Sequence, residues 1–205
     1  MNLAQISMAE FDMAPACYVR PDHAAAALGL PVGLAESLLG RERFGGRLSM
    51  LLITGLCLLP CRDVAIAEPD RRLALQPAAT IAALPRLFGC LWHAGPIRHV
   101  IARDERRAVI DAVGAPLHGV LLRNPTVGLA VPPEPGKRLV EQIDPHGAAL
   151  VGHWLDGLPP AFAERLRLML PPALAPEEDM PSPDRHEMAA LIEGALLISG
   201  QLGDG

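Results

Sequence analysis

Apolar residues recur along this chain at the spacing of short amphipathic helices. Three blocks show the pattern, at 84–91, 109–113 and 188–198. In the first block, Leu84, Leu87, Phe88 and Leu91 follow the i, i+3, i+4, i+7 rule and form one apolar face. Glycine and proline lie between the blocks, as at Gly95-Pro96, and end the helical pattern. The pattern predicts many short helices separated by turns.

The most hydrophobic stretch is LSMLLITGLCLLP, and it is apolar all the way round over Leu48–Leu59. Arg47 and Arg62 flank it, and it is shorter than the ~20 residues that a membrane-spanning helix needs. This predicts a buried central helix, preceded by a turn at 41–46 and followed by an extended or irregular stretch at 64–75.

Composition adds the fold class. Half of the residues are apolar, but Phe, Trp and Tyr make up only 3%, and strands favour aromatic and β-branched residues. The chain has 21 prolines and 19 glycines, which shorten the helices. We therefore expect an all-α fold, a single domain of many short helices broken by Pro/Gly turns.

The distribution of prolines and charges predicts three parts. Residues 1–47 form a loosely organised N-terminal segment, 48–172 form the helical core domain, and 173–205 form an acidic, proline-rich loop followed by a C-terminal helix that packs on the core. The segment 131–136, VPPEPG, reads as a stiff linker.

Several acidic residues stand where helix starts are expected. Asp104 is a predicted N-cap, Asp144-Pro145 a predicted helix start, and Asp184 with Glu187 a predicted capping box. After Pro160 the spacing predicts a helix that buries Phe162, Leu166 and Met169 and turns Glu164, Arg165 and Arg167 outward.

The chain carries little recognisable chemistry. Its net charge of −5 disfavours nucleic-acid binding, which needs a basic surface. No two of its seven histidines lie at a metal-ligand spacing, its four cysteines form no CxxC pair, and it lacks both GxSxG and a P-loop. His93, beside Trp92, reads as a partly buried packing residue. We therefore expect no catalytic, cofactor-binding or metal-binding residues, and a protein that is not an enzyme.

The order of segments resembles another group of proteins. LLITGLCLLP is followed by LFGCLWHAGPIRHVI, then by DERRAVIDAVGAPLHGVLLRNP, and last by RLRLMLPP at 165–172. Over about 48–172 this order resembles the SctK family (YscK, OrgA, MxiK and HrpB type) of type III secretion systems, including its rhizobial NolU-like branch.

The resemblance implies a structural role. SctK proteins are cytosolic parts of the sorting platform that bridge the SctD-like inner-membrane ring to SctQ-like pods, which connect through SctL to the ATPase. It implies a cytoplasmic protein, peripheral at the inner membrane and not inserted into it, with no cofactor. Two arginine surfaces are candidates for partner binding: Arg98, Arg103, Arg106 and Arg107 on one, and Arg165 with Arg167, beside the acidic loop 177–179, on the other.

Two other classes of function stay open at this point. One is a small helical enzyme whose site is assembled from residues far apart in the sequence. The other, less favoured by the negative net charge, is a helix-turn-helix DNA-binding regulator built on the short arginine-bearing helices around Gly95 and Gly114.

Overall fold

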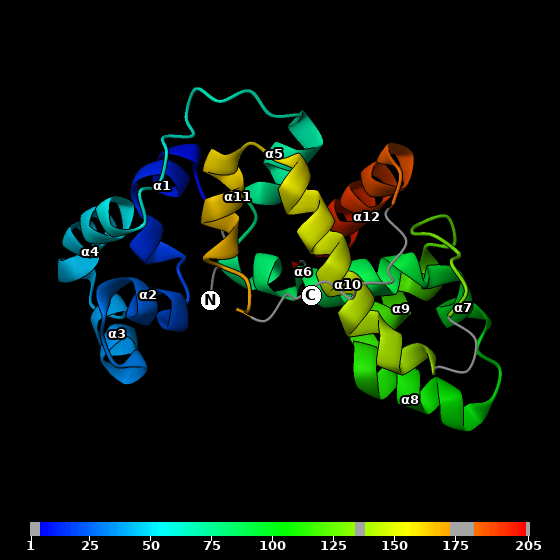
Figure 1. Ribbon diagram of the computed structural model, residues 1–205. Coiled ribbons are helices and arrows are strands. Elements are labelled where there is room, and N and C mark those ends of the chain that lie inside the picture. Colours follow the sequence, from blue (N-terminus) through cyan, green and yellow to red (C-terminus); the bar gives the residue numbers. More distant parts are fainter. Residues whose placement is uncertain (1–4, 134–137, 173–182, 204–205) are drawn as a thin grey trace. The chain divides into compact units, whose positions relative to one another are not determined.

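The computed structural model describes residues 5–133, 138–172 and 183–203, and most of these residues lie in helices (Figure 1). They form twelve α-helices and one 3-10 turn, with no strand among them. The all-α fold predicted from composition is confirmed. No single helix of the described part is long and apolar enough to cross a membrane. Helices α5 (Glu68–Ala74) and α6 (Ala78–Trp92) reach that length and apolarity only as a pair, which is bent by 116°.

The chain divides into two compact units. Unit 1 comprises 1–82 and 155–173, and unit 2 comprises 83–154 and 174–205. Two helices, α6 (Ala78–Trp92) and α10 (Leu139–Gly157), begin in one unit and end in the other. The division into three parts at 47 and 172 stays a prediction.

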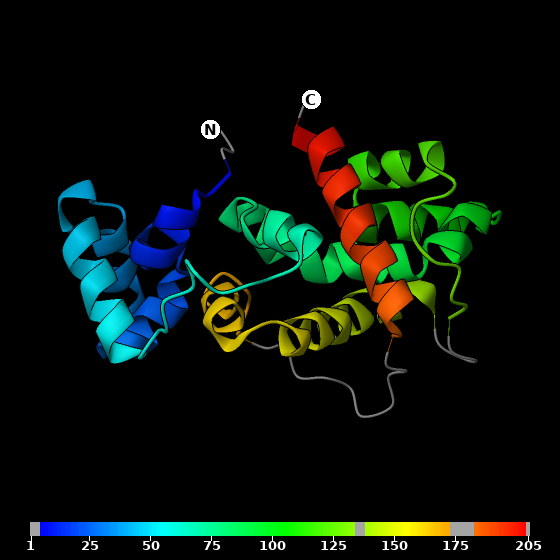
Figure 2. The same ribbon diagram turned by 90° about the horizontal axis from the view of Figure 1, so that it is seen from above.

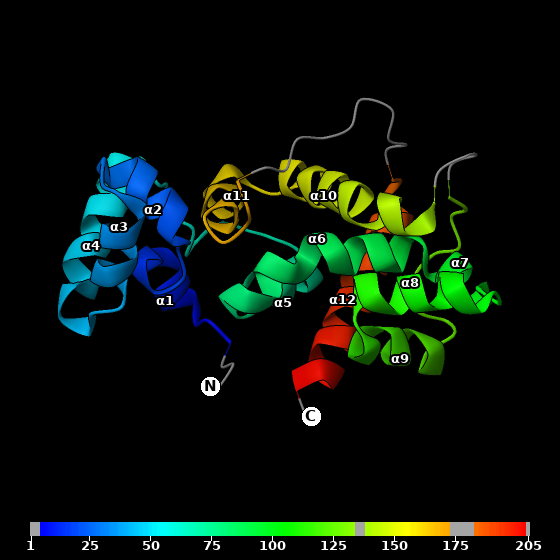
Figure 3. The same cartoon turned by 90° about the horizontal axis from the view of Figure 1, so that it is seen from below.

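Unit 1 contains the N-terminal helices and α11. Its elements are α1 (Met8–Met13), η1 (Pro15–Cys17), α2 (Pro21–Leu28), α3 (Val32–Leu39), α4 (Glu42–Gly55), α5 (Glu68–Ala74) and α11 (Pro160–Arg167). Helices α2, α3 and α4 pack against one another (blue to cyan in Figure 3). Helix α11 begins at Pro160, as the sequence predicts.

Helix α4 corrects two predictions. It begins at Glu42, so the predicted turn at 41–46 is wrong, and it ends at Gly55. Its buried residues, Leu48, Ser49 and Leu52, lie on one face, whereas Met50 and Leu51 are 60% and 49% exposed. The prediction of a fully buried central helix is therefore wrong: α1, η1, α2 and α3 pack on α4 within unit 1 and still leave Met50 and Leu51 exposed.

Helix α5 corrects a third prediction, because Glu68–Ala74 is helical where an extended or irregular stretch was expected. Pro69 stands in its first turn, where the missing N–H costs nothing, and Glu68 and Asp70 place negative charge at the positive end of the helix dipole.

The centre of unit 1 is a buried ion pair between Arg165 of α11 and Asp12 of α1, with Nη2 and Oδ1 3.2 Å apart. Arg165 is only 1% exposed, so the prediction that it faces outward is wrong. Its five N–H groups all donate: Nε to Phe11 O, Nη1 to Ala161 O and Leu59 O, and Nη2 to Asp12 O and Asp12 Oδ1. A buried guanidinium is tolerated because every donor has an acceptor.

Aromatic packing and further hydrogen bonds surround this pair. The Phe11 ring stacks on Tyr18 and on Phe162, with centroids 5.6 and 5.5 Å away. The Tyr18 hydroxyl donates to Phe11 O at 2.7 Å, and burial raises the pKa of that hydroxyl. The Cys61 N–H donates to Asp12 Oδ1 at 2.9 Å. The N-terminal helix, the segment after α4 and α11 therefore meet at one polar centre inside an apolar core.

Unit 2 is built from the larger parts of α6 and α10 together with four further helices. These are α7 (Ala94–His99), α8 (Arg103–Val113), α9 (Ala115–Arg123) and α12 (Arg185–Gly203). Helix α9 contacts both α8 and α12, and α12 is the orange-to-red helix beside it in Figure 2. The predicted capping box at the start of α12 is confirmed: Asp184 N–H donates to Glu187 Oε2 at 2.9 Å, and Glu187 N–H donates to Asp184 Oδ1 at 2.8 Å.

Two predicted helix starts in unit 2 are wrong. Helix α8 begins at Arg103 with Ala102 as its N-cap, so Asp104 lies in the first turn instead of capping the helix. Helix α10 runs through Pro145, although proline removes a backbone hydrogen bond at a cost of about 3 kcal/mol. Buried Ile143 and Leu150 stand on either side of Pro145, and their packing offsets that cost.

Helices α6 and α10 approach each other closely at two glycines. A Cβ added to Gly89 would lie 1.8 Å from Ile143 O, and one added to Gly147 would lie 1.6 Å from Pro85 O. Backbone therefore contacts backbone at this crossing, and only glycine leaves room for it at these two positions. Phe88 and Trp154 pack nearby in the same unit, with ring centroids 6.2 Å apart.

The buried ion pair generates a stability prediction. Arg165→Met leaves the Asp12 carboxylate buried without its cation, and we expect the free energy of unfolding in urea to fall by about 3–5 kcal/mol. Arg167→Met, two residues away, breaks only the exposed pair with Asp156, and we expect a loss below about 1 kcal/mol. Equal losses for the two variants, measured by circular dichroism, would contradict the central role of Arg165.

The helix crossing generates a second prediction, with a control in the same helix. Gly147→Ala pushes a methyl group into Pro85 O, and we expect unit 2 to lose about 3 kcal/mol of stability. Gly152→Ala, where nothing lies within 4 Å, should instead gain about 0.5–1 kcal/mol from helix propensity. Both tryptophans, Trp92 and Trp154, lie in unit 2, so tryptophan fluorescence in urea measures both changes. A Gly147→Ala protein as stable as Gly152→Ala would refute the close approach.

Candidate partner-binding surfaces

The arginines of α8 form one exposed face, which we call the α8 arginine face: Arg103, Arg106 and Arg107. All three side chains are exposed. Their i, i+3, i+4 spacing places them on one side of the helix, and Val109 and Val113 on another side are buried in unit 2. None of the three forms an ion pair with a described residue. This face can therefore pair with carboxylates of another protein.

Behind the α8 arginine face lies a buried histidine. His118 of α9 is 5% exposed, and its pKa is lowered by burial and, to a smaller extent, by the positive charge of Arg106. The side chain therefore stays neutral more readily than a free histidine, which suits its position between two packed helices.

Arg98 was predicted to belong to the same face, but the structure gives it internal partners. Its Nε donates to Leu121 O at 3.0 Å, and its Nη2 donates to Asn124 O at 2.9 Å and to Val127 O. The side chain is partly buried, and that burial lowers its pKa. Arg98 thus ties α7 to the end of α9 and to the segment after it, through the donors of its Nε and Nη2.

The second predicted surface does not form, because the side chains of Arg165 and Arg167 lie in different surroundings. Arg165 is buried in the ion pair with Asp12, whereas Arg167 is exposed and its Nη2 lies 3.1 Å from Asp156 Oδ1. The two arginines therefore do not form a ridge. The acidic stretch 177–179, predicted to lie beside them, is outside the described residues.

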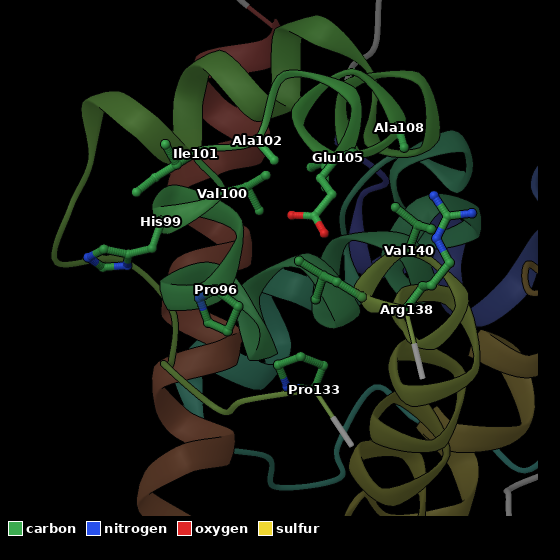
Figure 4. Close-up of a pocket in the computed structure, with 12 residues that line it drawn as sticks. Pro96, His99, Val100, Ile101, Ala102, Glu105, Ala108, Pro133, Arg138 and Val140 are labelled. Carbon is green, nitrogen blue, oxygen red and sulfur yellow. The ribbon is translucent and has the colours of Figure 1, made fainter. Parts of the chain in front are cut away.

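A pocket of about 480 Å³ opens beside α8 (Figure 4). Helical spacing places its α8 lining residues, Glu105, Ala108 and Val109, on the side away from the α8 arginine face. Its apolar lining includes Pro96, Val100, Ile101, Val109, Leu139 and Val140. The Glu105 carboxylate points into it from α8, with Pro96 and His99 on one side and Arg138 on the other. We call this the α8 groove. Sequence reasoning missed it because its walls come from three separate segments.

A histidine pair was also missed. His93 Nε2 and His146 Nδ1 lie 2.9 Å apart, and both side chains are buried. His93 Nδ1 lies 2.9 Å from Val131 O and must donate to it, because a carbonyl only accepts. In neutral rings His93 Nε2 then accepts from the Nδ1–H of His146. His93 was predicted to be partly buried, but it is fully buried, and it links the end of α6 to α10 and to the segment after α9.

The described residues provide no obvious reactive centre. No group of three or more His, Cys, Asp or Glu within them is placed to hold a metal ion. Burial raises the pKa of Cys61 and of Cys90 to about 12 each, which keeps both thiols protonated and unreactive. The features that stand out in unit 2 are thus two surfaces of α8 that lack internal partners, one basic and one largely apolar.

Comparison with known proteins identifies relatives over most of the chain. The family model described as YOP proteins translocation protein K (YscK) matches residues 5–191. The nodulation protein NolU of Rhizobium fredii is 30% identical over 100 residues, which are 48% of this chain and 47% of NolU. NolU of Sinorhizobium fredii (strain NBRC 101917 / NGR234) matches to the same extent.

The chain therefore spans about half the length of the curated relatives it matches. No solved structure matches it. The family match is broader than the NolU matches and covers helices of both units. Because the family model matches residues 5–191, the chain belongs to the YscK family of type III secretion components.

Proposed function

We propose that this protein is a structural adaptor of the cytosolic sorting platform of a type III secretion system. In this role it bridges the cytosolic domains of an SctD-like inner-membrane ring protein to SctQ-like pods, and through them reaches SctL and the ATPase. It acts at the cytosolic face of the inner membrane without inserting into it. The observation that carries the proposal is the YscK family match over residues 5–191.

The character of the family supports an adaptor over a catalyst. YscK proteins are secretion-apparatus components rather than enzymes. Two of the matched relatives are named as nodulation proteins, which supports a symbiotic setting for the proposed role.

The α8 arginine face supports a role in protein contact. Three exposed guanidinium groups stand within one helical turn and have no ion-pair partner among the described residues. Arginine binds carboxylates through two parallel hydrogen bonds, so an acidic partner surface is the natural complement. Arg103, Arg106 and Arg107 are thus the contact residues in the proposal, whereas Arg98 and Arg165 support the fold and Arg167 is available only if its pair with Asp156 opens.

Charge reversal on α8 tests the proposal. We expect Arg103→Glu with Arg107→Glu to weaken binding of either the purified ring domain or the pod protein at least tenfold, because each reversal replaces attraction by repulsion at an interface. Binding is measured by biolayer interferometry at physiological salt with the full chain. Circular dichroism should show an unchanged fold, since both side chains are exposed.

The matched control is Arg71→Glu with Arg72→Glu, an adjacent exposed pair on α5 that gives the same change in net charge. We expect it to change the affinity of that partner by less than threefold. If the α8 and α5 variants weaken binding equally, the effect is one of overall charge. If neither weakens binding, the α8 arginine face is not a partner surface.

A further inference from the structure

The α8 groove combines three features. Its walls are mainly apolar, it carries two opposite charges, and Ile101 at its rim is 93% exposed. A volume of about 480 Å³ lies within the range of sites that bind a ligand. Apolar side chains left in water are stabilised when a partner covers them, so this combination favours a bound segment.

The two charged side chains of the groove have no ion-pair partner within the described part of the chain. Glu105 and Arg138 both line it, yet neither the Glu105 carboxylate nor the Arg138 guanidinium forms a hydrogen bond or ion pair with a described residue. In Figure 4, Glu105 lies near the centre of the groove and Arg138 at one side. An occupant with a basic and an acidic residue would pair with both.

The groove is separate from the α8 arginine face. Glu105, Ala108 and Val109 follow i, i+3, i+4 spacing and line the groove, whereas Arg103, Arg106 and Arg107 follow the same spacing on another side of the helix. One helix therefore presents two surfaces of different chemistry. An occupant of the groove need not displace a protein bound to the arginines.

We propose that the α8 groove binds an amphipathic segment of a partner protein, whose apolar side chain enters between Val100 and Val140. A basic residue of that segment pairs with Glu105, and an acidic residue on its other side pairs with Arg138. In this mode of binding an apolar side chain of the segment is buried in the groove, and the two charge pairs determine in which direction the segment runs. The inference rests on the groove itself and does not depend on the adaptor role.

A displayed library of random twelve-residue peptides tests this proposal. The full chain is immobilised, enriched peptides are sequenced, and the best one is synthesised for fluorescence anisotropy. We expect enriched peptides to share an apolar residue flanked by Lys or Arg on one side and Asp or Glu on the other. Glu105→Arg should lower the affinity for the synthetic peptide at least tenfold. Changing the basic residue of the peptide to Glu should restore its binding to that variant.

Two further variants control the experiment. Glu105→Gln keeps the size of the side chain and should weaken binding by a smaller factor, which separates loss of charge from disturbance of α8. Glu193→Arg makes the same reversal at an exposed carboxylate of α12 outside the groove, and it should leave binding within twofold.

Three outcomes would overturn the proposal. One is the absence of any enriched peptide. Another is an enriched peptide that binds Glu105→Arg and Arg138→Glu as tightly as the unaltered chain. The third is a concentration-dependent dimer, seen in sedimentation and abolished by Glu105→Arg, which would assign the groove to a second copy of this chain.

Discussion

The hydrogen bonds of the buried Arg165 guanidinium hold three distant segments of unit 1 together. This single side chain joins residues 11–12, Leu59 and α11, which lie far apart in the sequence, and it donates all five of its N–H groups to them. The backbone adds to the same connection, since Arg20 N–H donates to Leu168 O at 2.9 Å. A buried charge is costly unless its donors find acceptors, so we infer that this pair favours the arrangement that brings α1, Leu59 and α11 together.

Unit 2 is organised by a different constraint, the close contact of two backbones. Gly89 and Gly147 let α6 and α10 cross without side chains between them, and the His93–His146 pair spans the same two helices. Arg98 then fixes α7 to the end of α9. Helix α8 has one face in the core of unit 2. Its other two surfaces, the α8 arginine face and the α8 groove, face outward.

The sequence was informative wherever local chemistry decides the structure. Helical spacing predicted α6, a proline predicted the start of α11, and the Asp184–Glu187 spacing predicted the cap of α12. It failed where tertiary packing outweighs a local preference. Pro145 reads as a helix start but lies inside α10, and an apolar run reads as a core helix although α4 leaves Met50 and Leu51 exposed.

The candidate surfaces show the same contrast between what local spacing predicts and what tertiary packing decides. The i, i+3, i+4 spacing of Arg103, Arg106 and Arg107 was visible in the sequence, and the structure leaves all three exposed. Arg165 has the same side chain and a similar local pattern, yet it is buried, because its partner Asp12 lies more than 150 residues away and no local spacing reveals it. The groove was hidden for a related reason, since Glu105 and Arg138 come together only in the folded unit.

Taken together, these features describe a helical protein whose buried charges maintain its fold and whose exposed charges are available to partners. We propose that the protein works by holding other secretion components together. The most direct measurement is purification of the tagged chain from its native cell, under conditions in which the secretion system is expressed, followed by mass spectrometry. The account predicts recovery of both the ring protein and the pod protein with the tagged chain. Recovery of neither, from cells shown to assemble the system, would contradict it.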